Sequence, residues 1–227
     1  DIRSEVWLPT SNWNGKYVGI GNGIWAGSIS YGEVAATLAR GYAVAATDTG
    51  HTGNGLTAEW AIGHPEKLVD FGHRAVHETT VSAKRMVEAF FGRGPSLSLW
   101  NSCSTGGRQG LMAAHRYPED FDAISAMAPA NPMTDLMTQS MWAGWQPQRT
   151  PGAALSAQQF ASVHQAAVKQ CDALDGLADG LIGRPDACRF DPATVEGLSP
   201  QQVETVRAVY RVPPGLPAWP VGRELQL

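Results

Sequence analysis

Apolar residues recur along residues 1–131 in two alternating patterns. Short apolar runs predict strands over residues 5–9, 16–21, 42–48, 96–100 and 121–130, while helical periodicity predicts helices over 30–40, 72–91 and 111–117. The run at 42–48 is almost continuously apolar, which is typical of a strand buried in a parallel sheet. Strands that alternate with helices predict an α/β fold.

A turn of small residues, Ser102-Cys103-Ser104-Thr105-Gly106, joins the fourth of these strands to a helix. It matches the G-x-S-x-G nucleophile elbow except that serine replaces the first glycine. Such an elbow would expose the Ser104 hydroxyl as a nucleophile and aim the Thr105 N–H at an oxyanion. The alternative is a Ser/Gly turn that caps the helix.

A glycine-rich segment at residues 21–27 follows an early strand. In α/β-hydrolases a loop at this place supplies the second oxyanion N–H, so Gly23 and Ile24 are the candidate donors. A plain Asn-Gly turn is the alternative interpretation.

The composition changes after Asn131. Methionine and tryptophan become frequent, prolines interrupt the chain near residue 150, and a helix is predicted over 156–171. We interpret residues 1–131 as a core and residues 132–227 as an inserted, mainly helical lid. An ordinary helical subdomain is equally compatible with this pattern.

An acidic stretch lies within residues 171–182. Three carboxylates, those of Asp172, Asp175 and Asp179, are separated by turn glycines and would repel one another unless solvated or bound to a hard cation. Calcium is the cation that suits such ligands, although the spacing is not that of an EF-hand. A solvated acidic turn is the alternative.

The residues around Ser104, from Cys103 to Leu111, with 116–122 and 128–130, resemble the nucleophile region of the tannase and feruloyl esterase family. The resemblance runs from Trp13 to Tyr210. It implies an α/β-hydrolase core with a calcium-binding lid and an acyl-enzyme formed on Ser104. The calcium ligands that it implies are the carboxylates of Asp172, Asp175 and Asp179 and the carbonyls of Leu177 and Leu181.

The chain has three cysteines. In an oxidising compartment Cys171 and Cys188 would close the acidic loop as a disulfide and leave Cys103 over. Free, buried cysteines in a cytosolic protein are the alternative. The resemblance implies that Cys103 pairs with a further cysteine beside the catalytic histidine.

Serine needs a base, and in α/β-hydrolases the acid and base follow it in the chain. His115 lies roughly 16 Å along the helix from Ser104 and His164 falls in the lid, so neither is convincing. The resemblance places the catalytic Asp and His beyond the lid. We therefore expect both to be absent and the chain to be incomplete at both ends.

Three other histidines need separate interpretations. His51 follows a strand, and we expect it to hydrogen-bond its own turn. His73 and His77 have i, i+4 spacing that could bind a metal, but no third ligand is evident. We interpret that pair as part of a packed or solvated helix face.

Charge and hydropathy argue against two classes of protein. A net charge of −4 without a basic run argues against nucleic acid, and no apolar stretch is long enough to span a membrane. The first hypothesis is a secreted or periplasmic serine carboxylesterase for aromatic or phenolic esters. The second is an inactive, calcium-stabilised module that binds an aromatic ligand. The sequence leaves the acyl group and the oligomeric state open.

Overall fold

The computed structural model describes residues 1–211, 220–222 and 224 and divides the chain into two compact units, Asp1–Asn131 and Pro132–Leu227. Within the described part of the chain, no helix combines the length and apolar character that crossing a bilayer requires.

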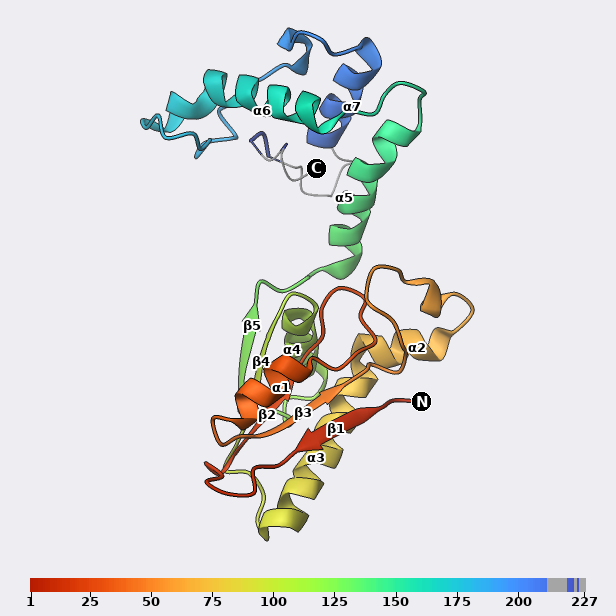
Figure 1. The fold of residues 1–227 in the computed structure, drawn as a ribbon, viewed down its shortest axis with the longest axis vertical. Coiled ribbons are helices and arrows are strands. Elements are labelled where there is room, and N and C mark those ends of the chain that lie inside the picture. Colours follow the sequence, from red (N-terminus) through yellow and green to blue (C-terminus); the bar gives the residue numbers. More distant parts are fainter. Residues whose placement is uncertain (212–219, 223, 225–227) are drawn as a thin grey trace. The chain divides into compact units, whose positions relative to one another are not determined.

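The first unit contains one mixed sheet with helices on both of its faces (Figure 1). Its strands are β1 (Ser4–Trp7), β2 (Lys16–Ile20), β3 (Ala43–Thr47), β4 (Leu97–Cys103) and β5 (Ala123–Met127). Its helical segments are α1 (Tyr31–Leu38), η1 (Glu59–Ala61), α2 (Pro65–Val69), η2 (Asp70–Arg74), α3 (Ala75–Phe91) and α4 (Thr105–Arg116). The expected α/β class is confirmed.

The strand order is β1-β3-β2-β4-β5, with β1 antiparallel to β3 and the other pairs parallel. The chain passes from β2 to β3 on one side and returns to β4 on the other. The loops that leave β2 and β4 therefore diverge, and such a switch point opens a crevice at the carboxyl ends of parallel strands. Residues 21–27 and Ser104 both lie at this edge.

The side chains alternate between two cores because successive strand residues face opposite sides. Tyr17 and Trp100 pack with α3 and α4 on one face, and Val18 and Val44 pack with Val34 of α1 on the other. This sandwich fixes the sheet, and hence the positions of the loops at its carboxyl edge.

Two boundaries differ from the sequence expectation. Strand β4 continues to Cys103 and α4 begins at Thr105, so a single residue, Ser104, turns the chain from strand to helix. Of the helix expected at 72–91, residues 75–91 form α3, whereas residues 72–74 belong to the π-helical segment Asp70–Arg74, which follows α2. Periodicity did not reveal either feature, because both depend on tertiary packing.

The second unit is mainly helical. It contains α5 (Met133–Trp145), η3 (Gln146–Gln148), α6 (Ala157–Cys171), η4 (Asp172–Asp175), η5 (Pro192–Thr194) and α7 (Pro200–Tyr210). Helices α6 and α7 each begin with a capping box, formed by Ser156 with Gln159 and by Ser199 with Gln202. Their apolar faces meet at Val163 and Val206.

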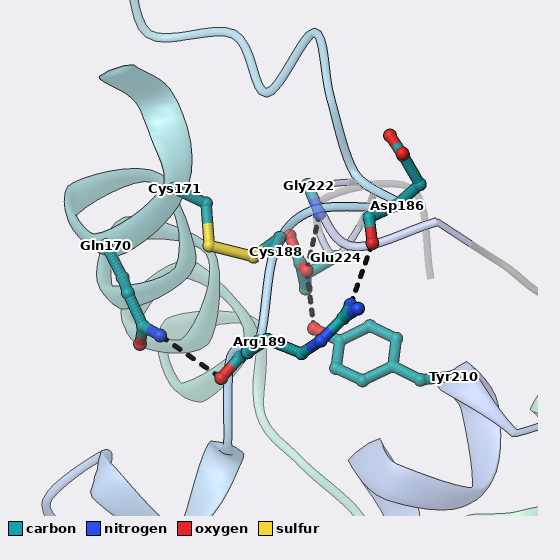
Figure 2. Close-up of a disulfide and its surroundings, with 8 residues drawn as sticks. All are labelled: Gln170, Cys171, Asp186, Cys188, Arg189, Tyr210, Gly222 and Glu224. Carbon is teal, nitrogen blue, oxygen red and sulfur yellow. Dashed lines mark hydrogen bonds between the residues drawn. A yellow bond between two sulfur atoms is a disulfide. The ribbon is translucent and has the colours of Figure 1, made fainter. Parts of the chain in front are cut away.

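A disulfide joins Cys171, at the end of α6, to Cys188 (Figure 2). The structure thus contains the predicted pairing, and Cys103 is free and exposed. Beside the disulfide, the Gln170 side chain donates to the Arg189 carbonyl at 3.2 Å. Residues 172–187 therefore form a loop that is closed at its base.

We expect the paired substitution Cys171→Ser with Cys188→Ser to destabilise the second unit. Opening a loop with a sequence separation of 17 raises the entropy of the unfolded chain, which should cost about 3 kcal/mol. Calorimetry of the single variant Cys103→Ser is the matched control and should leave the melting temperature unchanged. An unchanged melting temperature in the double variant would contradict the role assigned to this disulfide.

Candidate active site

Ser104 has an unusual backbone conformation. Its φ and ψ are 58° and −120°, a region that L-residues rarely adopt. Residues in sparsely populated regions cost on the order of 1–3 kcal/mol and gather at functional sites. Ser104 is exposed, as expected for a nucleophile elbow.

Backbone hydrogen bonds hold this turn on both sides. The Ser104 N–H donates to the Met127 carbonyl, and the Ala130 N–H donates to the Ser104 carbonyl, each at 3.0 Å. The indole of Trp100 also donates to the Gly106 carbonyl at 2.9 Å. The turn is therefore fastened to the end of β5 and to the core beneath it.

Close packing explains why serine can replace the first glycine of the elbow motif. A Cβ added to Gly106 would lie 2.0 Å from the Ser102 Oγ, and one added to Gly21 would lie 2.6 Å from the Gly106 Cα. Ser102 fits because these two glycines present no side chain to it. Gly21 and Gly106 thus provide the space that the first glycine of the motif would otherwise leave.

A reciprocal amide pair ties the loop at 21–27 to the nucleophile helix. The Gln109 Nε2 donates to the Asn22 Oδ1 at 2.9 Å, and the Asn22 backbone N–H donates to the Gln109 Oε1 at 3.0 Å. The Asn22 amide also donates to the Thr47 carbonyl at 2.8 Å. Both side chains are buried, so this satisfied network fixes the loop to α4 and to the end of β3.

Thr105 provides a second connection to the same loop. Its buried hydroxyl donates to the Ile24 carbonyl at 2.8 Å. The two segments expected to supply oxyanion N–H groups are therefore in direct contact. Ile24 itself has a φ of 50°, which is strained for a β-branched residue.

Arg108 anchors α4 to the π-helical segment. Its guanidinium donates to the carbonyls of Phe71 and Gly72 at 3.1 and 3.2 Å and lies 4.9 Å from the Phe71 ring centroid. Burial lowers the pKa of Arg108, and its Nε–H has no hydrogen-bond partner among the described residues. The nucleophile helix is thus held by side chains on two of its faces.

No catalytic base contacts Ser104 within the part of the chain that the structure describes, since no side chain there hydrogen-bonds to its hydroxyl. His115 is exposed at the far end of α4. His164 lies in the second unit, where its Nδ1 is 3.0 Å from a carboxylate oxygen of Glu224. His115 is therefore not placed as a base for Ser104, and His164 is engaged by Glu224 within its own unit.

His73 and His77 have different hydrogen-bond partners, and both rings contact Tyr117. The His73 Nδ1 is 2.7 Å from the Tyr117 hydroxyl, and the His77 Nδ1 is 2.9 Å from an Asp120 oxygen. Burial lowers the pKa of His73 and raises that of Asp120. These contacts explain the pair as packing and hydrogen-bonding groups.

The acidic loop is exposed and binds its own backbone. Asp172 accepts from the N–H groups of Asp179 and Gly180, and Asp175 accepts from those of Leu177 and Gly183. Among the described residues, no three Asp, Glu, His or Cys side chains come close enough together to hold a metal ion.

Sequence reasoning missed two parts of this site. Asn22 and Gln109 meet across 87 positions of sequence, and nothing local to either residue reveals the partner. His51 contacts its own turn as expected, with its Nδ1 at 3.3 Å from the Thr49 hydroxyl, but its shorter contact, at 2.8 Å from Nε2 to the Trp25 carbonyl in the loop at 21–27, was not expected. Its position after a strand, at the edge where site loops gather, was the available signal.

Comparison with known proteins agrees with this geometry. The profile of the family described as tannase and feruloyl esterase matches residues 1–212. An uncharacterized esterase of Xanthomonas campestris pv. campestris is 36% identical over 221 residues, which cover 94% of this chain and 38% of that protein. A probable feruloyl esterase B-2 of Aspergillus flavus is 38% identical over 226 residues, covering 92% and 42%.

Solved structures extend the likeness to the fold. An esterase from Aspergillus oryzae superposes with a TM-score of 0.82 at 34% identity, covering 99% of this chain and 47% of that one. Feruloyl esterase B from the same organism gives 0.81 at 30% identity, covering 99% and 48%. The chain thus spans less than half the length of these relatives. On this evidence the chain belongs to the tannase and feruloyl esterase family.

Proposed function

We propose that this chain carries the nucleophile half of a serine carboxylesterase that hydrolyses esters of aromatic or phenolic acids. The observation that carries the proposal is the strained, exposed Ser104 between β4 and α4, whose neighbour Thr105 hydrogen-bonds to Ile24 in the loop at 21–27. Relatives named as feruloyl esterases support the substrate class.

The geometry suits acyl transfer. The Ser104 Oγ would attack the ester carbonyl while a base takes its proton, and the resulting oxyanion would accept hydrogen bonds from the Thr105 N–H and from Gly23 or Ile24. Collapse breaks the bond to the alcohol, which leaves with that proton. Water then repeats the sequence on the acyl-enzyme and releases the acid and Ser104.

Ser104 needs a base and an acid that orients it, and no described side chain of the first unit hydrogen-bonds to its hydroxyl. We propose that both lie in a further part of the complete protein, as the family resemblance implies. The isolated chain should therefore be nearly inactive. The alternative, an inactive module that binds an aromatic ligand, requires that the complete protein also lack a base at Ser104.

The second unit offers apolar groups suited to a flat ring. Met141 and Trp145 on α5 are 73% and 51% exposed, whereas Trp142 donates to the Ala208 carbonyl. Exposed aromatic and thioether side chains are typical of surfaces that bind apolar ligands. We propose that the second unit acts as the lid.

We also propose that the acidic loop binds one structural calcium. Carboxylates and carbonyls are the donors that calcium prefers, and the chain between Asp172 and Gly183 folds around the carboxylates of Asp172 and Asp175. The donor chemistry fits. Binding would require the three carboxylates to move closer together, with the carbonyls of Leu177 and Leu181 completing the ligand set.

Secretion is the location that we propose. The Cys171–Cys188 disulfide supports it, because structural disulfides persist in oxidising compartments.

Ser104→Ala in the complete protein should lower kcat for a 4-nitrophenyl ester of a phenolic acid by several orders of magnitude, because it removes the nucleophile. Ser140→Ala, at an exposed serine of α5, is the matched control and should retain activity. Wild-type turnover by the Ser104→Ala variant would rule out the proposed nucleophile.

The strain at Ser104 predicts a stability difference between two inactive variants. Ser104→Gly and Ser104→Ala both remove the hydroxyl, but only glycine adopts this backbone conformation without a steric penalty. The glycine variant should be more stable to urea by about 1 kcal/mol or more. Equal stability of the two variants would show that the turn is not strained.

Purified protein should hold about one calcium per chain, and chelation should lower its melting temperature. The ion should add about 2.7 kcal/mol when free calcium is 100-fold above its Kd. Asp175→Ala should abolish this response, while Asp186→Ala, in the same disulfide-closed loop but outside the ligand set, should preserve it. Protein that contains no calcium, and whose melting temperature changes with neither chelator nor added calcium, would refute the proposed site.

A further inference from the structure

His51 packs against two aromatic rings, those of Trp60 and Phe71, which also contact each other. It is only 4% exposed, its ring stacks on Trp60 at a centroid distance of 3.8 Å, and the Phe71 ring makes an edge contact at a centroid distance of 5.9 Å. This packing fixes the plane of the imidazole and therefore the directions of its two nitrogens.

The hydrogen-bond partners assign the proton on this ring. The Nε2 lies 2.8 Å from the Trp25 carbonyl, which can only accept, so Nε2 must carry a hydrogen. The Nδ1 lies 3.3 Å from the Thr49 hydroxyl, which donates to the Asp48 carbonyl at 2.7 Å. The shorter of the two His51 hydrogen bonds, from Nε2 to the Trp25 carbonyl, thus joins this histidine to the loop at 21–27.

That loop needs external support. A 2.9 Å bond from the Ala26 N–H to the Gly23 carbonyl closes a turn, and Ile24 occupies its strained position with a φ of 50°. Backbone strain persists only where surrounding contacts over-determine it. The bond from Thr105 to the Ile24 carbonyl supplies one such contact.

The segment that carries His51 supplies the others. Gly27 and Gly53 exchange backbone hydrogen bonds at 3.1 and 3.4 Å, and the Trp25 N–H donates to the Gly55 carbonyl at 3.3 Å. A Cβ on Gly27 would lie 2.5 Å from the His51 Cδ2, so the two segments are in close contact. The contacts of Gly53 and Gly55 with this loop are made by backbone groups, whereas His51 contacts the loop through its side chain.

We propose that His51 is a positioning residue for ester hydrolysis. It holds the turn at Gly23–Ala26 so that the backbone N–H of Gly23 or Ile24 stays directed at the oxyanion. The inference rests on the proposed function. His51 would act through the Trp25 carbonyl and would not touch the substrate. Its loss should therefore affect the transition state more than substrate binding.

The test uses two substitutions in the complete protein. His51→Phe keeps a ring against Trp60 and removes the donor, and it should lower kcat about 10- to 100-fold, less than the roughly 100- to 1,000-fold cost of deleting an oxyanion donor. KM should change little. His51→Gln places an amide N–H near the position of Nε2 and should recover most of kcat. His115→Phe, at an exposed histidine of α4, should behave as wild type.

Hydrogen exchange provides a readout independent of turnover. In His51→Phe the amides of Trp25, Ala26 and Gly27 should exchange faster, while those of β2 and β4 should not. If the phenylalanine variant does not fold, His51→Met, which fills space without donating, replaces it in the comparison with His51→Gln.

Two results would overturn the inference. One is an unchanged kcat and unchanged exchange in the variant that lacks the donor. The other is an equal loss of kcat and melting temperature in the donor-free and glutamine variants, because packing alone would then explain His51. Retained activity in Ser104→Ala would instead overturn the proposed function, so the two failures are distinguishable.

Discussion

The strained backbone at Ser104 is the constraint on which the rest of the site depends. Strand β4 passes into α4 through this single residue. The turn is therefore tight, and the residues packed against it must be small. Gly106 and Gly21 leave the space that Ser102 occupies. The Met127 carbonyl, at the end of β5, accepts a hydrogen bond from the Ser104 N–H. The energy that maintains this arrangement comes from the two cores of the sheet, which fix the strand ends.

The second constraint is the connection between two loops that are distant in sequence. Gln109 and Thr105 on the nucleophile helix bind Asn22 and Ile24, so displacement of either segment would disturb both. His51 contacts the same loop from the segment that follows β3. Preorganised N–H groups stabilise an oxyanion because they need no reorientation during the reaction, and a loop held at several points meets that requirement.

Local sequence patterns predicted much of this architecture. The alternation of strands and helices predicts the α/β class, and the small-residue turn alone indicates Ser104 as the candidate nucleophile. The Asn22–Gln109 pair and the Trp25 contact of His51 could not be predicted, because each joins residues brought together only by the strand order. The calcium ligands and the lid assignment stay predictions, since carboxylate spacing gives the donor chemistry without the coordination geometry.

The most direct measurement is the identity of the residue that becomes acylated. The complete protein should be mixed with a slowly hydrolysed phenolic ester, quenched in acid and digested, and the modified peptide located by mass spectrometry. The strained turn predicts an acyl group on the Ser104 hydroxyl, formed stoichiometrically and absent from denatured protein. An acyl group on another residue, or turnover without any covalent intermediate, would contradict the assignment of Ser104 as the nucleophile.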